Sequence, residues 1–66
     1  MDLSAKRLIK ILGENGFLLK RIRGSHHIFY HPESHITVPV PIHGKELKKG
    51  TFWGILNEAG IDKNQI

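Results

Sequence analysis

Residues 24–29 read Gly-Ser-His-His-Ile-Phe and hold the side chains best suited to chemistry in this chain. Glycine lets backbone N–H groups approach an anion closely, and Ser25 adds a hydroxyl donor. His26 and His27 carry imidazoles, whose ordinary pKa lies near neutrality and therefore suits proton transfer. Placed at the start of an expected strand, this combination fits chemistry on a phosphodiester.

Basic residues lie next to this motif and recur later in the chain. Ten lysines and arginines stand against six acidic residues, which gives a formal net charge of +4. Such a surplus favours a polyanionic partner, because neutralised phosphates release counterions, although a basic surface that is merely solvated fits the charge equally well. The candidates for phosphate contact or transition-state stabilisation are Arg21, Arg23, Lys45, Lys48 and Lys49, together with the backbone N–H of Gly24.

Apolar spacing predicts two helices. The first follows Ser4, a suitable N-cap, and should end near Leu12, before two glycines interrupt the pattern. The second should have Thr51 as its N-cap and should end at Gly60. The residues at helical spacing are Ala5, Leu8, Ile9 and Leu12 in the first helix, and Phe52, Ile55, Leu56 and Ala59 in the second.

Three short strands are predicted between the helices, over residues 17–23, 26–30 and 36–40. The short connections between these strands imply an antiparallel meander. Pro39 has no backbone N–H to donate, so the third strand should lie at an edge of the sheet or contain a bulge. The order α-β-β-β-α predicts an α+β fold of the double-stranded-RNA-binding type, a three-stranded antiparallel sheet with both helices on one face. Trp53 lies beside the apolar stripe of the second helix, so we expect it to be partly exposed to a partner protein or a base.

Composition narrows the class of protein. A chain of 66 residues predicts a single domain, residues 1–66, with a small core. The absence of cysteine excludes thiolate nucleophiles and zinc–thiolate sites and is typical of a reducing cytoplasm. No apolar run has the length of a membrane span, so we expect a soluble, cytoplasmic protein with no membrane partner. Neither metal-ligand spacing such as His-Glu-x-x-His nor a cofactor motif occurs, and no cofactor or metal is expected.

Strand alternation separates the two histidines of the motif. It places His26 on one side of the second strand with Ile28 and Tyr30, and His27 on the other side with Phe29. The two imidazoles then point apart, which favours one catalytic histidine. A mechanism with both histidines remains open if the strand begins after His26, and Ser25 and His27 are therefore possible catalytic support.

The motif and its surroundings resemble the HicA family of toxins, and the resemblance spans nearly the whole chain. It implies a small ribonuclease that cuts messenger RNA and is held inactive by a HicB-type antitoxin covering the active site. It also implies that His26, the first histidine of the motif, is catalytic, whereas the second histidine varies in the family. The resemblance rests on residues 24–29, His31-Pro32, Val38-Pro39, residues 44–47, Lys49-Gly50-Thr51 and Ala59-Gly60-Ile61.

Three functions are compatible with the sequence. The first is a metal-independent endoribonuclease toxin in which His26 is the general acid or base, with mRNA and the antitoxin as partners. The second is a non-catalytic RNA-binding module of the same fold, for which topology and charge suffice. The third is an adaptor whose open sheet face docks another protein.

Overall fold

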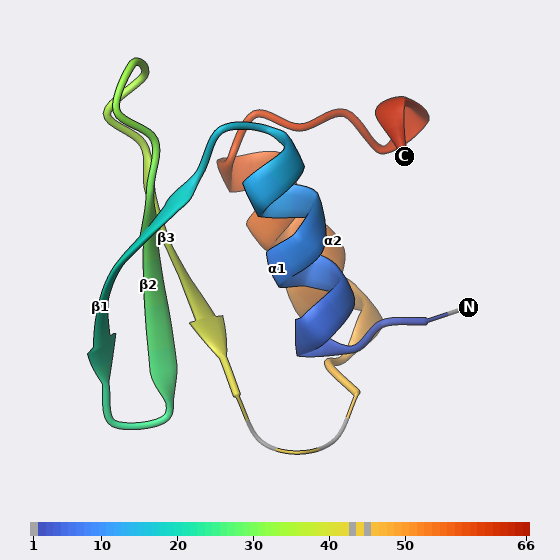
Figure 1. Cartoon of the computed structure of the whole chain (residues 1–66). Coiled ribbons are helices and arrows are strands. Elements are labelled where there is room, and N and C mark those ends of the chain that lie inside the picture. The colour runs from blue at the N-terminus through green and yellow to red at the C-terminus, as the bar shows by residue number, and fades with distance from the viewer. Residues whose placement is uncertain (1, 43, 45) are drawn as a thin grey trace.

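A three-stranded antiparallel sheet is covered on one face by two helices, while its other face is open (Figure 1). The computed structural model describes residues 2–42, 44 and 46–66, so the candidate Lys45 lies outside the described residues. The predicted α+β order is confirmed, with one short 3₁₀ helix added at the end. The elements are α1 (Ala5–Glu14), β1 (Leu18–Arg23), β2 (His26–Tyr30), β3 (Thr37–Pro41), α2 (Lys49–Glu58) and η1 (Lys63–Gln65).

Helix α1 begins where the sequence predicts and ends two residues later. The Ser4 hydroxyl oxygen accepts a hydrogen bond of 3.1 Å from the backbone N–H of Arg7, which satisfies one of the free donors of the first turn. The helix continues past Leu12 through the exposed Gly13 to Glu14, and the chain turns only at Gly16, with φ of +88°. Ile11, which lies outside the predicted stripe, is buried.

Helix α2 begins earlier than predicted. Its N-cap is Lys48, whose backbone is extended and whose side chain makes no capping hydrogen bond, and Thr51 lies inside the first turn. The expectation that Thr51 is the N-cap is therefore wrong. The preceding Leu47 is buried, and its backbone N–H donates to the carbonyl of Leu3 at 2.9 Å, so this anchor decides where the chain turns into the helix. Gly60, with φ of +77°, follows the helix as predicted.

The strand order is β1-β2-β3, with both pairs antiparallel. Strand β3 is an edge strand, which is where the missing N–H of Pro39 is tolerated. Strand β1 contains a bulge that the sequence analysis did not predict. Leu19 pairs with Phe29 and Arg21 pairs with Ile28, so Lys20 is an extra residue in β1.

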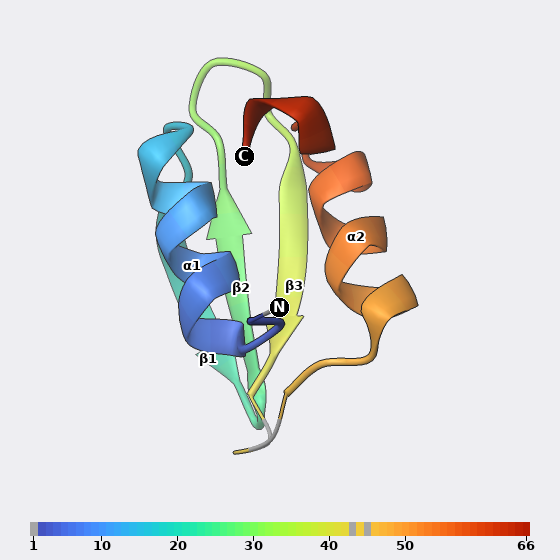
Figure 2. The ribbon, with the colours of Figure 1, turned by 90° about the vertical axis from the view of Figure 1, so that its right-hand side faces the viewer.

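The core lies between the two helices and strands β2 and β3. Figure 2 shows α1 and α2 side by side on the same face of the sheet. Strand β1 contributes little to this core, because all six of its residues are exposed. The largest fully buried side chains belong to Phe52, Leu8, Leu12, Leu56, Val38 and Val40. In the part of the chain that the structure describes, no helix has the length and apolar character needed to cross a bilayer.

Candidate functional site

The motif begins with Gly24 and Ser25, which form the turn between β1 and β2. It continues along β2 from His26 to Phe29. Gly24 adopts φ of +57°, the left-handed conformation that glycine supplies at the first position of a two-residue hairpin turn. The Ser25 carbonyl accepts a hydrogen bond of 2.7 Å from the backbone N–H of Ile42, just after β3. Since this bond ties the turn to the end of the neighbouring strand, the position at which β2 begins, His26, is well defined.

His26 lies on the open face of the sheet, because it alternates along β2 with the opposite face, which carries the buried Phe29. It pairs with Arg23 on β1, and the next residue on the same face, Ile28, pairs with Pro39 on β3. A shallow hollow on this face is lined by Arg23, Gly24, His26, Ile28 and Pro39. His26 is exposed, so its imidazole can be reached from solvent.

The bulge at Lys20 decides which side chains accompany His26. With strict alternation from Leu19, Arg21 and Arg23 would share the helix-covered face with Leu19. The extra residue reverses the alternation, so that Arg21 faces Ile28 and Arg23 faces His26 across the hairpin. Both arginines therefore lie on the open face. No run of residue types in the sequence signals such a bulge, because it depends on how β1 pairs with β2.

His27 lies on the opposite face of β2 from His26. It pairs with Ile22 and with Val40, which is fully buried. The His27 side chain is half-buried, and its Nδ1 is shielded from solvent without a hydrogen-bond partner among the described residues. As alternation predicts, the two imidazoles of the motif do not face each other.

The lysines at the start of α2 lie outside the hollow at His26. Lys48 and Lys49 are both exposed, but Lys49 borders a different hollow, whose other lining residues are Arg7, Trp53, Lys63, Asn64 and Ile66. That hollow is formed by the helices and the C-terminal segment. The structure thus brings Arg21, Arg23 and Gly24 together with His26, and it does not bring Lys49 to that site.

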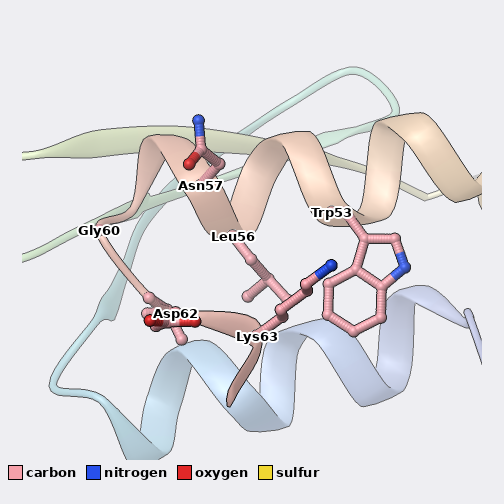
Figure 3. Close-up of a pocket in the computed structure, with 7 residues that line it drawn as sticks. Trp53, Leu56, Asn57, Gly60, Asp62 and Lys63 are labelled. Carbon is pink, nitrogen blue, oxygen red and sulfur yellow. The ribbon is translucent and has the colours of Figure 1, made fainter. Parts of the chain in front are cut away.

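Trp53 is half-buried, as the sequence predicts, and packs edge-on against Phe52 with the ring centroids 5.1 Å apart. Figure 3 shows its indole projecting from α2 beside Lys63, which belongs to η1. A third hollow, beside the one that Lys49 borders, is lined by Trp53, Leu56, Asn57, Gly60, Ile61, Asp62 and Lys63. Since it contains no histidine and α2 covers the opposite face of the sheet, it is separate from the hollow at His26.

Two further histidines have local structural contacts. His31 Nδ1 lies 3.2 Å and 3.1 Å from the backbone nitrogens of Glu33 and Ser34, and it accepts hydrogen bonds from them. His35 Nδ1 lies 2.9 Å from the hydroxyl oxygen of Tyr30. Over the described residues, no three histidine or carboxylate side chains gather in a way that could hold a metal ion.

A family of known proteins matches most of the chain. The family model for the HicA toxin of bacterial toxin–antitoxin systems matches residues 5–61, a span that includes both main helices, all three strands and the motif. No curated protein sequence matches the chain. Because the family match covers most of the 66 residues, from the first residue of α1 to just beyond α2, the chain belongs to the HicA family of toxins.

Proposed function

We propose that the chain is a metal-independent endoribonuclease that cleaves mRNA, with His26 as its general acid or base. The observation that carries this proposal is the position of His26, exposed in a hollow on the open face with Arg23 directly across the hairpin. The hollow supplies a group able to move a proton next to a fixed positive charge. Both promote cleavage of a phosphodiester, whose negative charge increases in the transition state.

Cleavage of RNA without a metal requires two proton transfers. The 2′-hydroxyl loses its proton as its oxygen attacks phosphorus, and the departing 5′ oxygen gains a proton as the P–O bond breaks. An imidazole can perform either transfer and contributes roughly 10²–10⁴-fold to the rate, and solvent water then accepts or supplies the proton of the other transfer. Arg23, and Arg21 beyond it, would stabilise the negative charge on the phosphoryl oxygens, and Gly24 and Ser25 would offer backbone N–H and hydroxyl donors.

The proposed reaction uses one histidine. His27 points to the helix-covered face with Ile22 and Val40, so a phosphate in the hollow beside His26 is out of its reach. We propose that His27 supports the site only by helping to pack the start of β2.

A HicB-type antitoxin would inhibit this enzyme by covering the open face. The described strands contain Lys20, Arg21 and Arg23 but no aspartate or glutamate, so acidic groups on the partner would steer its association. We expect residues 23–28 to become protected from hydrogen exchange in the complex. An inhibited complex in which this segment exchanged as fast as in the free toxin would contradict steric inhibition.

The proposed activity can be tested by incubating the purified protein with a long messenger RNA in excess EDTA. Appearance of shorter RNA fragments supports a metal-independent endoribonuclease. Retention of intact RNA together with measurable binding would instead indicate the non-catalytic RNA-binding module. If the protein neither cuts nor binds the RNA, the docking adaptor is the remaining function that fits the open face.

A further inference from the structure

The open face continues from His26 to the other end of β2, where Tyr30 lies. Tyr30 is on the same face as His26 because their positions in the strand differ by four, an even number. Four residues of strand place them ~13 Å apart. Across the sheet, Tyr30 pairs with Leu18 on β1 and with Thr37 on β3. Leu18 is 60% exposed and Tyr30 is half-buried, so the two side chains present part of an apolar surface to solvent.

The Tyr30 ring is held from two sides. The ammonium nitrogen of Lys20 lies over the ring, 5.2 Å from its centroid, and the hydroxyl oxygen lies 2.9 Å from His35 Nδ1. His35 has a left-handed backbone conformation, with φ of +62°, which non-glycine residues seldom adopt. An aromatic ring whose position is defined by its neighbours can receive a flat ligand with little loss of side-chain freedom.

The positive charge on this face favours a negatively charged ligand. Strand β1 carries three cations, which are Lys20, Arg21 and Arg23. They lie alongside the row of open-face residues on β2, which are His26, Ile28 and Tyr30. A second copy of the chain pairing through β1 would bring two such basic rows together, which like-charge repulsion disfavours. A ligand that carries evenly spaced negative charges and flat bases fits both rows.

We propose that Lys20, Tyr30 and His35 form a second RNA subsite, which binds a nucleotide of a single-stranded substrate away from the bond cleaved at His26. This inference rests on the proposed function and assigns its substrate class, single-stranded RNA long enough to span the open face. The base stacks on the Tyr30 ring, and the flexible stem of Lys20 carries its ammonium from the ring to the adjacent phosphate. A single strand is required because only unstacked bases can lie flat on a side chain.

The test measures RNA binding in the His26→Ala background, where the probe should remain uncut. The probes are a single-stranded RNA of about eight nucleotides, within the usual range of ~4–16 for such sites, and a dinucleotide, which cannot reach Tyr30 from His26. We expect Tyr30→Ala to raise the Kd for the longer RNA roughly 5- to 150-fold, as for loss of one base–aromatic stack, and to leave the Kd for the dinucleotide unchanged. Tyr30→Phe, which keeps the ring, should bind the longer RNA nearly as well as its parent.

Three results would overturn the second subsite. They are unchanged binding of the longer RNA by Tyr30→Ala, equal losses for both probes, and tighter binding of a base-paired RNA than of the single strand. Failure of the wild-type protein to cut RNA would contradict the proposed enzyme without affecting these binding results, so the two proposals fail separately.

Discussion

His26 and His27 are adjacent in the sequence but have different surroundings because β2 alternates its side chains between two faces. His26 is exposed beside Arg23, whereas His27 lies against Val40 under the helical layer. A polar atom that is buried without a partner lowers stability by about 1–3 kcal/mol. The shielded Nδ1 of His27 therefore predicts that this residue contributes less to folding than an apolar side chain of similar size would.

We predict that His27→Leu stabilises the protein. Replacing the shielded imidazole with an apolar side chain removes the unpaired nitrogen and keeps contacts with Ile22 and Val40. A gain of ~1 kcal/mol corresponds to an increase in Tm of about 4–8 °C for a domain of this size. Thermal unfolding followed by circular dichroism measures the change. A large decrease in Tm would show that the His27 imidazole makes a stabilising interaction.

At the scale of single elements, the N-cap of α1 could be predicted from the sequence, whereas the N-cap of α2 could not. Ser4 was predictable as an N-cap because its hydroxyl acts within its own turn. The start of α2 was not predictable in this way, because it is decided by the burial of Leu47 and its hydrogen bond to Leu3, which are distant in sequence. Local chemistry marks Thr51 as a cap, but tertiary packing moves the cap to Lys48.

The two hydroxyl residues give a matched pair of stability variants. We predict that Ser4→Ala destabilises the protein by about 1 kcal/mol, because it removes the hydrogen bond to the backbone of Arg7. Thr51→Ala should leave stability unchanged or raise it slightly, because Thr51 is exposed inside the helix and alanine has the higher helix propensity. Urea unfolding of both variants measures the difference. Equal destabilisation by the two substitutions would contradict the observed start of α2.

The bulge in β1 is the element on which the composition of the candidate site depends. It places Arg21 and Arg23 with His26, and the sequence shows only that these residues occur near the motif. Strand positions themselves were predicted to within one residue at each end, since alternation and turn residues are local signals. The bulge was missed because it is a property of a strand pair.

The bulge predicts that cations on β1 matter more for RNA binding than cations elsewhere. Arg23→Gln should weaken binding of single-stranded RNA roughly 1.5- to 5-fold, as expected for an exposed ion pair worth ~0.2–1 kcal/mol. Lys10→Gln is the control, because Lys10 is exposed on α1, on the other side of the sheet. Fluorescence anisotropy with labelled RNA measures both. Equal effects of the two substitutions would indicate that only net charge matters.

For the molecule as a whole, topology and charge were accessible from sequence, but the distribution of charge was not. The order α-β-β-β-α and the open face followed from element patterns and the need to bury two apolar stripes. The separation of Lys49 from His26 could not be read from the chain, because it depends on the helical layer to which Lys49 belongs. The basic surface therefore divides between two sides of the molecule.

This division predicts a limited salt dependence of RNA binding. If Lys20, Arg21 and Arg23 make the phosphate contacts, the logarithm of the binding constant should fall with the logarithm of salt concentration with a slope of about −2, that is ~0.7 for each of three contacts. Titrations at several salt concentrations give this slope, and Arg23→Gln should make it shallower by ~0.7. A much steeper slope would mean that the cations of the helical side also contact the RNA.

His26 is the only histidine of the motif to which the proposed mechanism gives a proton transfer, and comparing RNA cleavage by His26→Ala and His27→Ala with that of the wild-type protein tests this role. We predict that His26→Ala lowers the cleavage rate about 10²–10⁴-fold while the circular dichroism spectrum is preserved, since His26 is exposed. His27→Ala should retain most of the activity. Cleavage by His26→Ala at a rate close to that of the wild type, or equal losses in the two folded variants, would contradict the account.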